Sequence, residues 1–244
     1  SIESGEYMKI SVTGIRGKSS FVQWTEEVLR NRGYNTLAKV TGEKPFWIHN
    51  GEIIPIIRKN EIVLLNETLE YKKYKFDYFI AENQGIRPYT MKIFNDMVQP
   101  DIVTITNIRT DHTDTMGSTK EDICQSMGYS SNIARYVISG EEDSRLNSII
   151  HKHCPKTRFI RSEIPHLKVQ TPLNTLIGLI DSTLSTSGLD KLSTKEIDIL
   201  FEHIYRSMSI KDIGGFTSWF DGAKLNDVDS TKNIFDFTGK IKQD

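Results

Sequence analysis

The sequence predicts an α/β fold in which a mostly parallel sheet is flanked by helices. Up to about residue 110, short apolar runs alternate with loops and with stretches of helical periodicity, which is the order of parallel strands joined by helical crossovers. Runs such as 76–81 and 102–105 are continuously apolar and therefore indicate a sheet covered on both faces. A loop with two glycines separates the first strand from the first helix, as in α/β domains that hold phosphate groups.

Local signals place the individual elements. Residues 8–12 form the first apolar run, and a helix is expected from Lys18, because apolar residues recur at helical spacing after it and Gly33 suits its C-terminal cap. Residues 41–60 form a long excursion with a short hairpin around Asn50 and Gly51. We expect further strands at 35–40, 76–81, 102–105, 134–138 and 158–160, and further helices at 119–127, 172–185 and 194–208.

The composition is that of a soluble globular protein. The 244 residues are 37% hydrophobic and 26% charged, which suffices for a core, and no apolar run reaches the length of a membrane span. A formal net charge of −1 gives no field for a nucleic acid or an anionic membrane, so neither is expected as a direct partner. Cys124 and Cys154 lack C-x-x-C spacing, and we expect inert, buried thiols in a cytoplasmic protein.

The composition changes near the end of the chain. Gly214, Gly215 and the polar run 226–232 look like a linker into something new, yet only about thirty residues remain. We therefore expect residues 1–212 to form the main domain and residues 213–244 to hold a linker and the start of an incomplete C-terminal domain.

The sharpest local signal lies between the first strand and the first helix, where Gly14, Gly17, Lys18 and Ser19 occur together. Glycines let backbone N–H groups turn inward, the helix N-terminus attracts an anion, the lysine adds positive charge and a serine hydroxyl can hold Mg²⁺. The pattern G-x-x-x-x-G-K-[ST] is matched imperfectly, because Val12 stands where its first glycine would lie. We predict a shortened phosphate loop, with a plain helix start as the alternative.

Two more polar segments are expected at the same edge of the sheet. Glu82 follows the strand at 76–81, and His112 lies in the segment that follows the strand at 102–105. Ligands of open α/β sheets collect beyond the carboxyl ends of the strands, so both side chains could face the phosphate loop. A carboxylate and an imidazole there would suit Mg²⁺ beside a triphosphate. Taken singly, a solvated strand-end charge and a loop histidine are the alternatives.

These segments resemble those of a known family. Residues 13–19 resemble the T-G-x-x-G-K-[ST] loop of the Mur ligase superfamily, and residues 106–114 resemble its T-N-x-x-x-D-H-x-D segment. Glu82 stands between them, where that superfamily places a Mg²⁺-binding glutamate. The G-I-R-G-K-S loop and the segments 39–42, 114–117 and 226–231 are similar to the ligase subunit of poly-γ-glutamate synthases. The joint occurrence of these motifs in this order makes the resemblance specific.

The resemblance implies an ATP-dependent, ADP-forming ligase that phosphorylates a carboxylate and joins it to an amine. It implies ATP and Mg²⁺ as cofactors, and glutamate or a similar amino acid with a carboxylate acceptor as substrates. The resemblance also suggests two kinds of partner, further copies of this chain in a homo-oligomer and membrane-bound synthase subunits. The latter would place the protein at the membrane periphery. Carried over by position, the catalytic residues would be Lys18, Glu82 and His112, the nucleotide contacts Gly14, Arg16, Gly17, Lys18, Ser19, Ser20 and Asn174, and the metal ligands Ser19, Thr41, Glu82 and His112.

Some features depart from the superfamily's pattern. Ser126 stands where many Mur ligases carry a carbamylated lysine, and the chain stops soon after the first residues expected of the third domain. The UDP-binding first domain of the Mur enzymes and the N-terminal membrane helix of the capsule-type ligases are not expected in this sequence. Two alternatives from other classes stay open: a nucleotide-binding module that awaits a partner subunit, and a generic P-loop ATPase coupled to a partner's motion.

A few other residues carry weaker signals. Phe21 and Trp24 lie at helical spacing and are expected in the core, and Trp47 is expected to be exposed or to cover a neighbour. Residues 151–154 contain two histidines and a cysteine, which we interpret as a solvated turn, with a metal site as the alternative. Arg87 and Pro88 fit either a turn or a contact with an acidic substrate.

Overall fold

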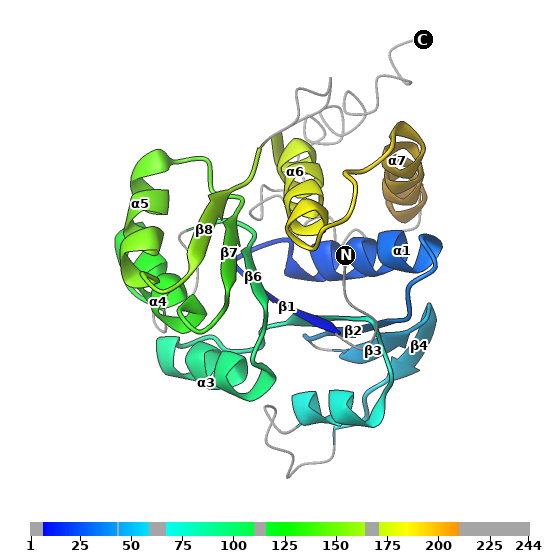
Figure 1. Ribbon diagram of the computed structural model, residues 1–244, viewed down its shortest axis with the longest axis horizontal. Helices are drawn as coiled ribbons and strands as arrows, with labels where there is room; N and C mark the ends of the chain where they lie inside the picture. Colours follow the sequence, from blue (N-terminus) through cyan, green and yellow to red (C-terminus); the bar gives the residue numbers. More distant parts are fainter. Residues whose placement is uncertain (1–6, 43, 59–66, 110–115, 164–170, 210–244) are drawn as a thin grey trace.

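The computed structural model of the chain describes residues 7–42, 44–58, 67–109, 116–163 and 171–209. An eight-stranded sheet forms the centre, with helices on both faces (Figure 1). Its strands are β1 (Met8–Thr13), β2 (Thr36–Val40), β3 (Phe46–His49), β4 (Glu52–Pro55), β5 (Tyr78–Glu82), β6 (Ile102–Ile105), β7 (Tyr136–Ser139) and β8 (Arg158–Arg161). The helices are α1 (Lys18–Asn31), the short 3₁₀ helix η1 (Leu69–Lys73), α3 (Pro88–Val98), α4 (Lys120–Ser131), α5 (Ser144–His153), α6 (Thr171–Thr186) and α7 (Thr194–Ser209).

The strand order is β4-β3-β2-β5-β1-β6-β7-β8. All strands from β2 to β8 along this order are parallel, whereas β3 and β4 add an antiparallel hairpin at one edge. The chain leaves β1, forms β2 two places away, returns to β5 and then crosses β1 to add β6 on the other side. The strand order thus reverses around β1, which is where an open α/β sheet forms a crevice for a ligand.

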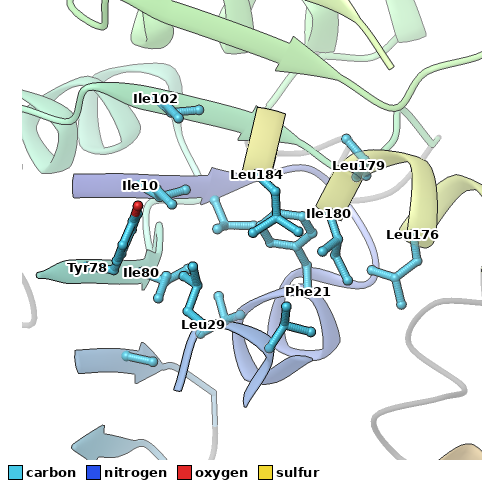
Figure 2. Packing of buried hydrophobic residues seen from close by; sticks show 14 of the residues in the cluster. Ile10, Phe21, Leu29, Tyr78, Ile80, Ile102, Leu176, Leu179, Ile180 and Leu184 are labelled. Carbon is cyan, nitrogen blue, oxygen red and sulfur yellow. The ribbon is translucent and has the colours of Figure 1, made fainter. Parts of the chain in front are cut away.

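Two layers of helices bury the sheet. Helices α1 and α6 cover one face, and α3, α4 and α5 cover the other (Figure 1). On the first face, Phe21 of α1 and Leu184 of α6 meet Ile10 and Ile80 of the central strands (Figure 2). Full burial of one such side chain contributes about 1.5–3 kcal/mol. The carboxyl ends of β1, β5 and β6 are thereby held in a fixed relation to the start of α1.

Most of the expected elements are confirmed to within a few residues, including the hairpin. Its turn consists of Asn50 with φ 50° and Gly51 with φ 85°, the backbone that an Asn-Gly turn adopts. Trp47 lies in β3, 4% exposed, and packs on Phe79, so it covers a neighbour. Phe21 is fully buried, and Trp24 packs against the same core, as expected.

The sequence-based interpretation missed two helices. Arg87 and Pro88 are not a plain turn: they are the N-cap and first residue of α3, where proline has no hydrogen bond to lose. The interpretation of residues 151–154 as a solvated turn is wrong, because His151 to His153 form the last turn of α5 and basic side chains suit that end of the helix dipole. Cys154 caps the helix and is buried.

No helix in the described part of the chain has the length and hydropathy needed to cross a membrane. The expected boundary between residues 212 and 213 lies outside the described residues.

Candidate functional site

Two glycines shape the loop between β1 and α1. Gly14 has a φ of 123°, and a Cβ atom added there would lie 2.1 Å from Oγ1 of Thr106 and 2.8 Å from its backbone nitrogen. Gly17 is the N-cap of α1 and has a left-handed backbone, with φ 82°. Both conformations are costly for residues that carry a Cβ. The loop therefore lies flat against the segment after β6, and α1 starts directly at Lys18.

The segment after β6 holds the loop through three hydrogen bonds to Arg16. The backbone N–H of Arg16 donates to Oδ1 of Asn107 at 3.2 Å. The carbonyl of Arg16 accepts from Nδ2 of Asn107 at 3.0 Å and from Oγ1 of Thr106 at 2.6 Å. The N–H of Ile15 also donates to the carbonyl of Asn107. These contacts of Thr106 and Asn107 were not predicted, although polar residues directly after a buried strand are a signal for a role at this edge.

A carboxylate stands beside this loop at the end of β5. Glu82 is 6% exposed, and its Oε2 accepts hydrogen bonds from Oγ of Ser19 at 3.0 Å and from the backbone N–H of Thr41 at 3.1 Å. Three expected metal ligands, contributed by α1, β5 and the turn after β2, therefore meet at one point. The Glu82 carboxylate and the Ser19 hydroxyl are hard oxygen donors, the kind that Mg²⁺ prefers.

Lys18 starts α1 and folds back over the loop. Its Nζ donates to the carbonyl of Gly14 at 2.9 Å, so the positive charge lies above the loop rather than out in solvent. Ser20, the next residue of the expected phosphate-binding set after Ser19, is buried in the first turn of α1. The loop thus combines a helix N-terminus with a lysine, an arrangement suited to an anion.

Asn174 belongs to a different part of the same sheet edge. It lies in the first turns of α6, 8% exposed, next to Thr175, whose Oγ1 contacts Oε1 of Glu142 at 3.4 Å just beyond the end of β7. Asn174 thus lies on α6, whereas the cluster around Ser19 is built from α1, β5 and the turn after β2.

His112 falls outside the described residues, as do its neighbours from 110 to 115. Ser126, at the position of the expected carbamylated lysine, is buried in α4 and donates to the carbonyls of Met116 and Asp122. Its hydroxyl is therefore used locally. The described part of the site consists of the loop, Lys18, Ser19, Thr41 and Glu82.

A second charged group lies behind the site, on the opposite face of the sheet. Lys39 of β2 is fully buried, and its Nζ lies 2.9 Å from Oε1 of Glu67. Burial lowers the pKa of Lys39, although the hydrogen bond and charge of Glu67 act the other way. Burial would also raise the pKa of Glu67, but hydrogen bonds from Arg58 and Lys39 outweigh it and hold that pKa below its usual range. This buried pair was not predicted, because a lysine in a short strand normally faces solvent.

The chain is similar in sequence to known proteins. Residues 12–160 match the Mur ligase middle domain. The PGA synthase CapB of Bacillus subtilis (strain 168) is 30% identical over 125 residues, which cover 48% of this chain and 32% of that relative. The match thus spans about a third of that relative's length.

Solved structures share the fold. Escherichia coli FolC in complex with ADP superposes with a TM-score of 0.59 at 17% identity, over 78% of this chain and 56% of that one. The bifunctional folylpolyglutamate synthase/dihydrofolate synthase of Yersinia pestis, complexed with AMPPNP and a Mn ion, has a TM-score of 0.55 at 17% identity, over 78% and 55% of the two chains. Because the middle-domain match extends over more than half of the sequence and includes the loop, Glu82 and the segment after β6, this chain belongs to the Mur ligase family.

Proposed function

We propose that the protein is an ATP-dependent amide ligase that joins the amine of glutamate, or of a similar amino acid, to a carboxylate acceptor, as in poly-γ-glutamate synthesis. The observation that carries this proposal is the meeting of Ser19 and Thr41 on the buried carboxylate of Glu82, directly beside a glycine loop. The matched relative is named a PGA synthase, which supports an acidic amino acid as substrate.

The residues present fit a magnesium nucleotide. The backbone at Gly14 leaves no room for a Cβ, and Glu82 is a buried carboxylate whose described partners are a hydroxyl and an N–H. Ser19 and Glu82 would hold the metal, with Thr41 beside them, and His112 is proposed as a further ligand from the family resemblance. The metal would supply charge neutralisation for phosphoryl transfer.

The reaction would proceed in two steps that this site can support. The acceptor carboxylate attacks the γ-phosphorus of ATP, an acyl phosphate forms and ADP leaves. The amine of the amino acid then attacks the carbonyl carbon, the amide bond forms as the nitrogen gives up a proton to water, and inorganic phosphate leaves with the electrons of the C–O bond. Lys18 and the N–H groups at the start of α1 would stabilise the negative charge on the phosphoryl oxygens, and no nucleophilic side chain is required.

The test is an ADP-release assay with ATP, Mg²⁺, glutamate and an acidic acceptor. We expect release to depend on both glutamate and acceptor, hydroxylamine to trap the acyl phosphate as a hydroxamate, and Lys18→Ala to abolish both signals. Lys72→Ala, which changes an exposed lysine on η1, is the matched control and should behave as the wild type. Binding of ATP without any amino-acid-dependent release would instead support a nucleotide-binding module that awaits a partner subunit, and release indifferent to amino acids would support a plain ATPase.

A further inference from the structure

The buried pair of Lys39 and Glu67 lies directly behind the candidate site. The side chains of Lys39 and Glu67 are 0% and 4% exposed, and Lys39 also donates to Oε1 of Gln84 at 2.8 Å, two residues after Glu82. The ring of Trp47 lies under the ammonium group, 5.8 Å from Nζ to its centroid. A buried ion pair is an inefficient way to stabilise a fold, because desolvation offsets most of the attraction. In some proteins such a pair fixes one arrangement of the groups that it connects.

Arg58 extends this pair toward the site. Its Nε and Nη2 donate to the two oxygens of Glu67 at 2.9 and 3.3 Å, and its Nη1 donates to the carbonyl of Gly42 at 3.2 Å. Gly42 follows Thr41, whose N–H donates to Glu82. A continuous series of contacts therefore runs from the buried lysine to the turn that meets the candidate metal-binding carboxylate.

The turn at Gly42 needs such a restraint. Gly42 has a φ of 116°, and a Cβ added there would meet nothing within 4 Å. Glycine at this φ is free to move in ways that other residues are not, and no described residue packs against the place of its missing side chain. In the described part of the chain, one hydrogen bond, from the N–H of Thr41, joins this turn to Glu82.

The restraint acts from the face of the sheet that does not carry the ligands. Lys39 is in register with Ala81, and the next residue of β5 is Glu82. Successive side chains of a strand point to opposite faces, so Glu82 faces α1 while Lys39 faces the layer of Trp47. The described hydrogen bonds of the three charged residues therefore reach the site through the carbonyl of Gly42 and the side chain of Gln84.

We propose that Lys39, Glu67 and Arg58 form an ionic clamp that positions the turn of Thr41 and Gly42 over Glu82. The members of the clamp are positioning residues, since none of them contacts the loop or the Glu82 carboxylate by a described hydrogen bond. The link from the clamp to catalysis rests on the proposed function, whereas the link to the turn rests on the contacts alone. Preorganisation of this kind matters because a displacement of about 1 Å in a reactive geometry can lower a rate by about 100-fold.

The test uses Arg58→Met in the full chain, because Arg58 is 28% exposed and its loss threatens folding less than the loss of Lys39. Arg32→Met is the matched control. Arg32, at the end of α1, also forms a bidentate pair, but its partner is Glu196 of α7, away from the site. Hydrogen exchange measured by NMR should show the Thr41 amide exchanging at least about tenfold faster in Arg58→Met and in Glu67→Gln, but not in Arg32→Met.

Kinetics provide the second readout. We expect Arg58→Met to lower kcat about 10- to 100-fold with the KM for ATP changed less than about threefold, and Arg58→Lys to recover part of the loss. Unchanged exchange of the Thr41 amide in both Arg58→Met and Glu67→Gln would overturn the clamp, whatever happens to kcat. If the Thr41 amide exchanges faster in the variants but the wild type releases no ADP with glutamate, the clamp is supported and the proposed ligase activity is contradicted. Failure of the clamp and failure of the proposed function are therefore distinguishable.

Discussion

The side chain of Asn107 bonds both backbone groups of Arg16, the N–H and the carbonyl. Its Oδ1 accepts the backbone N–H of Arg16 and its Nδ2 donates to the carbonyl of the same residue, as the backbone of a neighbouring strand would do. Asn107 is 7% exposed, so water competes little for these bonds. The shape of the loop between β1 and α1 therefore depends on a side chain that lies 91 positions away in the sequence.

Asn107→Ala should weaken nucleotide binding without unfolding the protein. The substitution removes two hydrogen bonds, worth together about 1–3 kcal/mol, and we expect the Kd for ATP with Mg²⁺ to rise roughly 5- to 150-fold. Calorimetric titration measures this change. Asn132→Ala is the control, because Asn132 likewise bonds a distant backbone N–H, that of Lys156, but outside the site. Equal Kd values for wild type and Asn107→Ala would show that the loop keeps its shape unaided.

Gly14→Ala should be far more harmful than Gly33→Ala. Both glycines have positive φ, 123° and 89°, but a Cβ at Gly33 would meet nothing within 4 Å whereas one at Gly14 would strike Thr106. Gly33→Ala should lower the free energy of unfolding by about 1–2 kcal/mol. For Gly14→Ala we expect a further 1–3 kcal/mol from overpacking and loss of ATP binding. Urea unfolding and ATP titration of both variants give the comparison, and equal effects would contradict the close approach of the loop to Thr106.

Local sequence signals were enough for much of the fold and part of the site. The glycine loop, the Asn-Gly hairpin and the buried strands are each set by neighbouring residues, through backbone conformation or a continuous apolar run. Glu82 could be expected at the loop, because the carboxyl ends of parallel strands share one edge. Its contact with Ser19 is the geometric result of β5 pairing with β1.

Other features depend on partners distant in sequence and could not be read locally. Lys39 looks like a solvent-facing residue until Glu67, far along the chain, is placed against it. The role of Asn107 likewise appears only when β6 pairs with β1. Helix α3 is a different case: Met91, Phe94 and Val98 are buried in it at helical spacing, so the signal was present. Arg87 and Pro88 were interpreted as a turn or a substrate contact, whereas Pro88 is the start of the helix.

Both cysteines should be unreactive in the native protein. Cys124 and Cys154 are buried, and burial raises the pKa of Cys124 to about 12 and the pKa of Cys154 above its usual value. Because the thiolate is the reactive form, we expect no reaction with an aromatic disulfide reagent at pH 8 over minutes, and reaction of both thiols in 6 M guanidinium, roughly the concentration that unfolds even hyperstable domains. Rapid modification of the native protein would show that the α4–α5 layer opens.

Arg32 and Glu196 should give the protein a stability that disappears in acid. Hydrogen bonds from Arg32 outweigh burial and lower the pKa of Glu196 from 4.5 to about 2. A carboxyl group whose pKa is depressed by folding stabilises the native state above its unfolded pKa and loses that contribution as the pH falls through the folded value. The difference in unfolding free energy between wild type and Arg32→Met should therefore be constant at neutral pH and shrink between about pH 4.5 and 2. This difference should not vanish, because Arg32 also donates to the carbonyls of Asp190 and Lys191.

Arg145→Met is the control, since the pair of Arg145 with Glu121 is largely exposed and worth only about 0–1 kcal/mol. A difference for Arg32→Met that is the same at pH 7 and pH 3 would mean that α7 is held by the backbone contacts of Arg32 and not by its ion pair.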